Sequence, residues 1–265
     1  MKRIAWILLA LTSGAAAWDL RGHRVVTAIA AEYLAPATLD WVESCLDQSA
    51  DVRARTLEGA STWADVVREE RPETRPWHYI NLPMGLGPGA PDRGQVVWAI
   101  ENYREEAAVS GQGERRAEAL AFLVHLVADI HQPLHTCNYF GPDYADGDMG
   151  GRKVRINHPW AKNLHQFWDS AGQPPDVTVA ELKARVARGS GGPQAHLVDT
   201  QAWAQESFSL ARQVGYPGGQ PPGSELSSEY QQRVREVCTQ RLFLAGLRLA
   251  YVLEKLGPEG RRAGL

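Results

Sequence analysis

The chain has 265 residues, with 28 basic and 31 acidic side chains that give a formal net charge of −3 at pH 7. This length allows one or two domains. The acidic balance argues against a broad basic surface of the kind that binds duplex nucleic acid. A polyanionic substrate would therefore need a local positive field.

Residues 1–17 form a predicted signal peptide. Lys2 and Arg3 provide a basic start, an apolar run covers residues 4–11, and three alanines precede the cleavage point. The apolar run is too short to span a membrane, and nothing later in the chain is long enough. We expect an exported protein, periplasmic or extracellular, that begins at Trp18 and has no membrane anchor after cleavage.

Apolar residues recur at helical steps of three and four through most of the remaining chain. Clusters of proline, glycine and serine separate the helical segments. The predicted helices cover residues 21–35, 39–46, 60–69, 96–108, 114–132, 160–170, 181–188, 202–214 and, from 224 or 227, the stretch up to 256.

The segments 84–93 and 138–151 are predicted loops, because they are rich in glycine, proline or aspartate. Charged and apolar residues alternate just after the second loop, which predicts a short strand or hairpin arm near 152–157. We find no internal repeat and no linker. The fold class is therefore predicted as all-α, with one mainly helical domain over residues 18–265.

The chain has 3 cysteines, so at most one intramolecular disulfide can form. If a disulfide forms, we expect it to join Cys45 and Cys238. Cys137 lies two residues after His135, so it is either a spare buried thiol, which we favour, or a metal ligand.

One predicted helix is apolar on nearly all sides except at His125 and Asp129. These two residues stand four apart, so they lie on the same face of the helix. A helix that is apolar all round is buried, and a buried His or Asp must be paired, hydrogen-bonded or bound to metal. Pro133 ends the helix and brings His135 just beyond it, with His131 as a further candidate.

His165 and Asp169 repeat the same spacing on another helical segment. Helix-stabilising His–Asp contacts are the alternative explanation, but two such pairs in one chain favour metal ligation. Asp65 lies on an otherwise apolar helical segment, and His78 follows a proline by two residues. Taken alone, these two are better explained as a solvated acid and a hydrogen-bonded imidazole.

Signal cleavage would place a free α-amine at Trp18, five residues before His23. An amine and its adjacent carbonyl can chelate a metal through a five-membered ring. Without further information, an anchoring aromatic is the simpler explanation for Trp18.

Nitrogen and carboxylate ligands without cysteine suit zinc in an exported protein. The candidates are too many for one ion and suit three, each with open positions for water and substrate. Three divalent ions would create a local positive charge that attracts phosphate to an acidic protein. The candidate ligands are Trp18, His23, Asp65, His78, His125, Asp129, His135, His165 and Asp169.

With these motifs the chain resembles the secreted trinuclear-zinc, single-strand-specific nucleases of fungi and plants, the mung bean nuclease type. The order and spacing of the motifs over most of the chain carry the resemblance. The matching segments are Trp18-x-x-x-Gly22-His23, Trp63-Ala-Asp65, Trp77-His78-Tyr79, His125-x-x-x-Asp129-x-His-Gln-Pro-Leu-His135, Gly150-Gly151 and Asn163-Leu-His165-x-x-Trp-Asp169.

The resemblance implies a mainly helical fold and zinc-dependent hydrolysis of single-stranded DNA and RNA to 5′-phosphorylated products, often with activity on 3′-nucleotides. It also divides the ligands among three zinc ions, with Asp129 bridging two of them. The first ion would be held by Asp65, His78, His125 and Asp129, the second by His135, His165 and Asp169, and the third by the Trp18 amine and carbonyl, His23 and Asp129. We expect a monomer.

The resemblance further implies that Asp65 orients the attacking water, that Arg68 contacts phosphate and that Tyr79 stacks on a base. Taken alone, Arg68 could equally be a solvated helix charge. Asn81 stands where the best-known fungal enzyme has an aspartate that reads the base edge, which leaves the base preference open. Arg152 stands where the family usually has asparagine, which leaves the local substrate contact open.

Two alternatives remain. Bacterial zinc-dependent phospholipase C shares an N-terminal Trp and a similar ligand set. Its first His lies farther from that Trp, however, and its last ligand is Glu where this chain has Asp169. The chain could also be a secreted zinc-binding helical protein without turnover, which saturation of all three ions by protein ligands would support.

Overall fold

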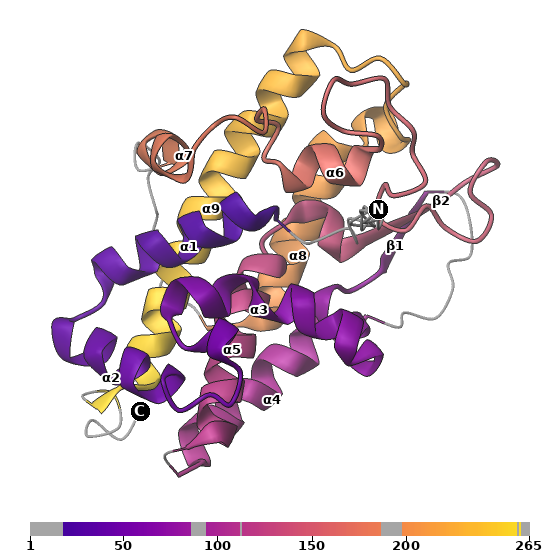
Figure 1. Cartoon of the computed structure of the whole chain (residues 1–265). Helices are drawn as coiled ribbons and strands as arrows, with labels where there is room; N and C mark the ends of the chain where they lie inside the picture. Colours follow the sequence, from indigo (N-terminus) through magenta and orange to yellow (C-terminus); the bar gives the residue numbers. More distant parts are fainter. Residues whose placement is uncertain (1–17, 86–93, 112, 187–197, 259, 261–265) are drawn as a thin grey trace, which may run out of the picture.

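The computed structural model describes residues 18–85, 94–111, 113–186, 198–258 and 260, so the predicted signal peptide lies outside the described residues. The mainly helical, single-domain prediction is confirmed (Figure 1). The α-helices are α1 Leu20–Tyr33, α2 Pro36–Leu46, α3 Leu57–Glu70, α4 Val96–Val109, α5 Glu114–Asp129, α6 Leu164–Asp169, α7 Val179–Val186, α8 Thr200–Leu210 and α9 Ser228–Leu256. Short 3-10 turns lie at Val52–Ala54, Pro72–His78, Pro133–Thr136 and Pro217–Gly219, and a π turn lies at Ala211–Gly215.

Helix α5 forms the centre of the fold. Every residue from Ala119 to Ile130 is fully buried, which confirms the predicted burial of this helix. It contacts α2, α3, α4 and α9. Because apolar residues surround its C-terminal half, the polar His125 and Asp129 are buried with it.

The long helix α9, yellow in Figure 1, supports α1 along its side. Gly246 allows the close approach, since a Cβ on it would lie 2.5 Å from Ile29 Cγ2. Helix α1 is capped by Asp19, whose side chain accepts hydrogen bonds from two backbone N–H groups of the first turn. The cap and the packing on α9 fix the chain around Trp18 and His23.

Two short strands, absent from the sequence prediction, form a small parallel sheet. Strand β1, Leu82–Gly85, pairs with β2, Cys137–Phe140. Each strand overlaps the start of a segment predicted as a loop, 84–93 for β1 and 138–151 for β2. Residues 86–93 lie outside the described part of the chain. Strand β2 is buried at all of its positions, so its sequence shows no alternation by which a strand could be recognised.

The predicted strand near 152–157 is wrong as a strand. Only a single antiparallel bridge forms there, between Arg155 and Asn163. The alternation itself is real, because Val154 and Ile156 are buried and Arg155 between them is exposed. Asn163, the partner in this bridge, also caps α6, its side chain accepting from a backbone N–H of that helix.

The predicted disulfide between Cys45 and Cys238 is wrong. All three cysteines are buried thiols, and Cys238 Sγ lies 3.9 Å from the Trp168 carbonyl oxygen. Helix α2, which carries Cys45, hydrogen-bonds α9 at Glu254, about 24 Å along the helix axis from Cys238. Cys137 belongs to none of the candidate metal groups in the described chain, in agreement with a buried thiol.

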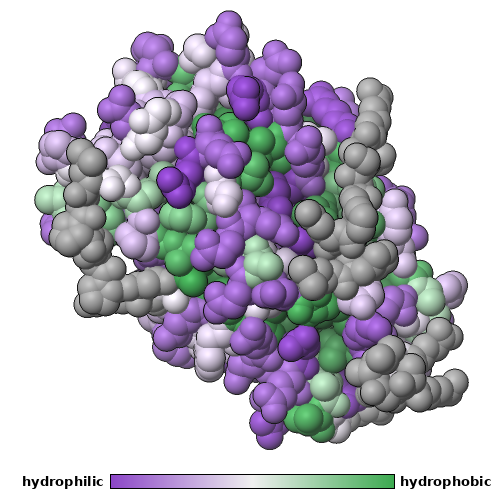
Figure 2. Space-filling model, turned by 180° about the vertical axis from the view of Figure 1, so that it is seen from behind, coloured by the Kyte–Doolittle hydropathy of each residue, from purple (hydrophilic) through white to green (hydrophobic). Residues whose placement is uncertain are grey.

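The surface opposite the view of Figure 1 is mainly hydrophilic, and its hydrophobic residues form scattered patches (Figure 2). Along the described residues, none of the helices combines the length and the apolar character that a membrane span requires.

Candidate metal centre

Two of the predicted ligands, His125 and Asp129, lie one turn apart near the end of α5. His125 Nε2 is 3.1 Å from Asp129 Oδ2, and His125 Nδ1 lies 2.7 Å from the Ser61 carbonyl oxygen, to which it can donate. That bond leaves Nε2 to bind a metal. Burial lowers the pKa of His125, but Asp129 and Asp65 outweigh burial and raise the pKa to about 9. A metal ion would therefore displace a proton here.

Asp65 of α3 and His78 complete a first cluster around this pair. His78 Nδ1 lies 2.9 Å from Asp129 Oδ2 and 3.1 Å from His125 Nε2, and Asp65 Oδ1 lies 3.7 Å from His125 Nε2. Ligand atoms at about 2 Å from a tetrahedral zinc stand roughly 3.3 Å apart, so this spacing fits one ion. Burial lowers the pKa of His78 to about 4, which keeps this imidazole neutral, as a metal ligand must be.

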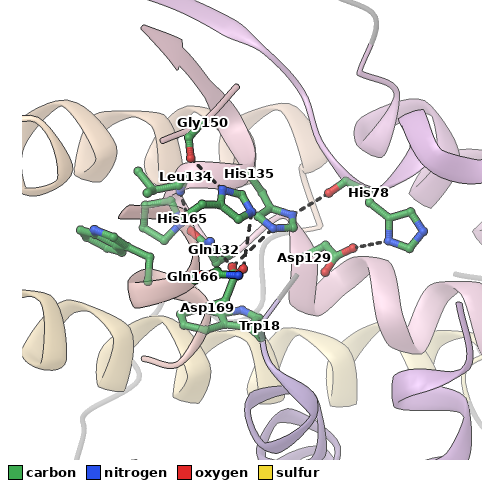
Figure 3. A network of polar contacts seen from close by, with 12 residues as sticks. Trp18, His78, Asp129, Gln132, Leu134, His135, Gly150, His165, Gln166 and Asp169 are labelled. Carbon is green, nitrogen blue, oxygen red and sulfur yellow. Dashed lines mark hydrogen bonds and ion pairs between the residues drawn. The ribbon is translucent and has the colours of Figure 1, made fainter. Parts of the chain in front are cut away.

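His135, His165 and Asp169 form a second cluster (Figure 3). His135 Nε2 lies 3.7 Å from Asp169 Oδ1, and His165 Nε2 lies 3.5 Å from Asp169 Oδ2. As predicted, Pro133 begins a turn after α5 that carries His135 to a site separate from His125. Burial raises the pKa of Asp169 to about 6 although His135 opposes the shift, so an added cation would stabilise its ionised form.

Backbone carbonyls orient both imidazoles of the second cluster. His135 Nδ1 lies 2.7 Å from the His78 carbonyl oxygen, and His165 Nδ1 lies 2.7 Å from that of Gly150. Gly150 has a φ of 62°, and a Cβ on it would lie 2.3 Å from the Leu134 carbonyl oxygen. This position therefore requires glycine, and the predicted Gly-Gly motif acts through its backbone.

His23 of α1 brings a third set of ligand atoms to the far side of Asp129. His23 Nε2 lies 3.4 Å from Asp129 Oδ1, whereas Asp129 Oδ2 faces the first cluster. The His23 ring stacks on that of His125, with centroids 4.1 Å apart. Burial lowers the pKa of His23. One carboxylate thus joins two groups of imidazoles, as the family resemblance implies.

Trp18 is fully buried and anchors the start of the described chain. Its indole Nε1 donates a hydrogen bond of 2.9 Å to the Ala128 carbonyl oxygen. The next backbone N–H, that of Asp19, donates 2.8 Å to the Asp169 carbonyl oxygen. These bonds hold the chain at residue 18 between the C-terminal ends of α5 and α6, beside two of the clusters.

Unsatisfied polar atoms concentrate at the predicted ligands. Among the described residues, nine buried side-chain nitrogen or oxygen atoms make no hydrogen bond, and seven of them belong to these ligands. A buried polar atom without a partner costs about 1–3 kcal/mol, so such a concentration calls for a bound cation. The seven atoms are His23 Nδ1 and Nε2, Asp65 Oδ1 and Oδ2, His78 Nε2, Asp129 Oδ1 and His135 Nε2. Several of them still have ion-pair contacts, Asp65 Oδ1 with Arg68, Asp129 Oδ1 with His23 Nε2, and His135 Nε2 with Asp169 Oδ1.

His131 is not among the candidate metal ligands. Its Nδ1 lies 2.6 Å from the Val127 carbonyl oxygen, and its Nε2 accepts from Arg248 Nη1 at 2.9 Å. Both ring nitrogens are thus used within the helical core. Burial, with Arg241 and Arg248 nearby, holds the pKa of His131 well below its usual value.

Arg68 is buried and points into the centre, which excludes a solvated helix charge. Its Nη1 lies 3.0 Å from Asp65 Oδ1, so Arg68 and Asp65 act together on the α3 side of the first cluster. A cavity of about 100 Å³ opens beside the second cluster. The cavity is lined by Tyr79, Asn81, Leu134, His135, Asn138, Met149, Arg152 and His165.

Several groups that support the site were not predicted. Gln132 Nε2 donates a hydrogen bond of 2.6 Å to Asp169 Oδ1, and the Ser61, His78 and Gly150 carbonyls orient imidazoles. The position of Gln132 between two candidate histidines is a signal that could have identified it. The backbone carbonyl groups leave no signal in the sequence, because every residue type has a backbone carbonyl.

A family model described as S1/P1 nuclease matches residues 18–257. The chain belongs to the S1/P1 nuclease family. Similar proteins include Nuclease S1 of Aspergillus oryzae, 30% identical over 286 residues that cover 95% of this chain and 96% of that protein. Endonuclease 3 of Arabidopsis thaliana is 26% identical, with 94% and 92% covered. Nuclease P1 of Penicillium citrinum is 28% identical over 171 residues, with 58% and 57% covered.

Membership of the S1/P1 nucleases confirms the predicted enzyme class, an endonuclease of the hydrolases. It also fits zinc as the metal, because three groups of His and Asp ligand atoms are present within the described residues. The match favours the nuclease over the phospholipase C alternative and over a binding protein without turnover.

Proposed function

We propose that this S1/P1 nuclease is a zinc-dependent phosphodiesterase that hydrolyses single-stranded DNA and RNA to 5′-phosphorylated products and also removes the phosphate of 3′-nucleotides. The observation that carries the proposal is the convergence of buried His and Asp ligand atoms in three groups. Asp129 lies between two of them, with Oδ1 facing His23 and Oδ2 facing His78 and His125. Such groups suit ions about 4 Å apart that clamp a phosphate during displacement.

Each ion has its own ligands in this proposal. Three zinc ions would supply Lewis-acid polarisation of the phosphate and activation of water. The first ion would be held by Asp65, His78, His125 and Asp129, the second by His135, His165 and Asp169, and the third by the Trp18 amine and carbonyl with His23 and Asp129. This third ligand set requires a chain that begins at Trp18, so residues 1–17 are a signal peptide removed on export. The mature protein, residues 18–265, acts as a monomer.

The side chains around the ligands have distinct tasks. Asp65 is a buried carboxylate beside the first cluster, where it orients the attacking water and accepts its proton. Arg68 is held by Asp65 and neutralises charge that builds up on the phosphate oxygens. As the new O–P bond forms, the bond to the 3′ oxygen breaks. The 5′-phosphate therefore stays with the downstream product.

The cavity beside the second cluster supports a preference for single strands. Tyr79 offers a ring on which an unstacked base can lie, and Asn81 lies at the same cavity. Stacking of this kind is worth about 1–3 kcal/mol and accepts every base. A base inside a duplex is already stacked and paired, so it would have to be extracted first.

One assay series tests this function. Protein beginning at Trp18 is incubated with single-stranded DNA, RNA, duplex DNA, a 3′-nucleotide and phosphatidylcholine, before and after chelation, and its metal content is measured. We expect cleavage of the single strands and the 3′-nucleotide, loss on chelation and recovery with zinc. Hydrolysis of phosphatidylcholine alone would instead identify a phospholipase.

A further inference from the structure

Arg152, which no ligand role requires, lies directly beside the second cluster. The Gly150-Gly151 turn delivers it there, and its Nη2 lies 3.2 Å from His165 Nε2. A zinc ion bound at His165 Nε2 would occupy the lone pair that this guanidinium now contacts. Arg152 would then present its donors to whatever binds beside the ion.

The Arg152 guanidinium differs from that of Arg68 in its ion-pair contacts. Among the described residues, no carboxylate lies within ion-pair distance of Arg152, whereas the other arginine at the centre, Arg68, is paired with Asp65. Burial lowers the pKa of Arg152 and Asp169 raises it, but a guanidinium keeps its charge in proteins. Arg152 therefore adds an uncompensated positive charge to the cavity that it lines.

The two arginines approach the centre from different parts of the fold. Arg68 comes from α3, beside the first cluster, and Arg152 comes from the turn beside the second. A phosphate bound between the clusters would thus meet guanidinium groups on two sides.

Building on the hydrolase activity proposed above, we propose that Arg152 is a specificity-determining residue. It favours a terminal phosphomonoester, such as the 3′-phosphate of a nucleotide or of an oligonucleotide end, over an internal phosphodiester. In both cases water attacks phosphorus and the bond to the 3′ oxygen breaks, so the two substrates differ in the charge and in the terminal oxygens of the bound phosphate.

The charge of the substrate explains the direction of this preference. A phosphomonoester carries about −1.5 to −2 at pH 7 and has three terminal oxygens, whereas an internal diester carries a single negative charge and has two. An additional cation attracts the doubly charged group more strongly. The planar guanidinium can also donate two parallel hydrogen bonds to the extra oxygen and its neighbour. An asparagine at this position would offer neither the positive charge nor the pair of parallel N–H donors.

The test compares Arg152→Asn and Arg152→Lys with a matched control, Arg155→Asn. The control substitution removes the same positive charge three residues away, from a side chain that is exposed. Each zinc-loaded protein is assayed on a nucleoside 3′-monophosphate and on a dinucleoside monophosphate with the same 5′ nucleoside. Zinc content and the Kd of inorganic phosphate are measured in parallel.

For Arg152→Asn we expect kcat/KM on the monoester to fall roughly 10- to 100-fold, the loss of a charge-assisted hydrogen bond. On the diester we expect a smaller fall of roughly 3- to 10-fold, since a single negative charge gains about half the electrostatic energy from the guanidinium. The Kd of phosphate should rise as the monoester activity falls. Arg152→Lys should keep part of the preference, and Arg155→Asn should match the unaltered protein.

Equal losses on both substrates with normal zinc content would overturn the proposed selectivity. Loss of zinc from Arg152→Asn and Arg152→Lys alike would assign Arg152 to the structure of the second cluster instead. A loss that depends on the base, largest for guanine, would make it a reader of the base edge. If the unaltered protein cleaves neither substrate, the proposed function fails, and the phosphate Kd alone decides whether Arg152 binds a multiply charged phosphate.

Discussion

Asp129 is the residue on which the proposed centre depends most, because its two oxygens face different groups of imidazoles. We expect Asp129→Asn to lose at least one zinc ion and to reduce turnover on single-stranded DNA a thousandfold or more, the order expected when metal activation of water is lost. Elemental analysis and a single-strand cleavage assay measure both effects.

The control for this change is Asp40→Asn, which removes an exposed carboxylate on α2 and should alter neither quantity. An Asp129→Asn protein that retains full zinc content and turnover would show that the shared-ligand assignment is wrong.

At the level of elements, the turn between β2 and α6 orients the imidazole of His165 in the second cluster, through the Gly150 carbonyl. In Gly150→Ala, the new Cβ would meet the Leu134 carbonyl oxygen, so the Gly150 carbonyl should shift away from His165. We expect loss of about one zinc ion per chain and of activity, while the ions at Asp129 remain. Zinc stoichiometry measured by elemental analysis reports this outcome.

Gly218→Ala is the matched control for this substitution. Gly218 also has a positive φ, 71°, but nothing lies within 4 Å of a Cβ built on it. It imposes a comparable backbone strain far from any ligand carbonyl. Equal zinc loss in both variants would point to general destabilisation rather than to the orientation of His165.

Helices α8 and α9 are joined by a buried ion network behind the metal centre. Glu206 accepts hydrogen bonds from Arg248 at 2.7 and 2.8 Å and from Arg241 at 3.0 Å. Burial raises the pKa of Glu206, but the two arginines outweigh burial and hold the pKa below its usual value. Glu206 therefore stabilises the fold above its unfolded pKa of about 4.3, and this contribution is lost as pH falls through its folded value.

We expect Glu206→Gln to lower the free energy of unfolding by about 3 kcal/mol at pH 7, since it leaves buried arginines unpaired. The difference from the unaltered protein should shrink as the pH falls below the unfolded pKa of about 4.3 and through the lowered pKa of folded Glu206. Urea unfolding at pH 7 and at a pH below the unfolded pKa of Glu206 measures this difference in unfolding free energy. Glu236→Gln, which changes an exposed residue of α9, is the control. A difference that does not change with pH would argue against the ionised pair.

Much of the helical framework could be predicted because apolar residues recur at helical spacing, all round in α5 and on one face in helices such as α1 and α9, between clusters of proline, glycine and serine. The grouping of buried His and Asp side chains could be predicted because His125 and Asp129 repeat the four-residue spacing of His165 and Asp169. The strands could not, since four buried residues such as Cys137–Phe140 carry no period. The carbonyls that orient the imidazoles were equally hidden, because a backbone group has no sequence signature.

For the whole molecule, the start of the chain belongs to the proposed site. A protein with one extra residue before Trp18 lacks the amine that would chelate the third ion. We expect such a protein to bind about one zinc ion fewer and to be inactive, although it folds, because the indole of Trp18 still anchors on α5. Metal analysis, circular dichroism and the cleavage assay separate these effects.

The control carries one extra residue after Leu265 and should be fully active. If the protein extended before Trp18 has the same zinc content and activity, the amine is not a ligand. In that case only His23 and Asp129 would remain as protein ligands of the third ion.

The sharing of Asp129 also affects how the centre fills. In the proposed centre, each ion that binds would fix the carboxylate for the other, so the occupancies of these two positions would be coupled rather than independent. As zinc is withdrawn, activity should decline more steeply than the average number of ions per chain. Partly filled molecules would then contribute little, and the population would divide into active and inactive chains rather than a series of weakened ones.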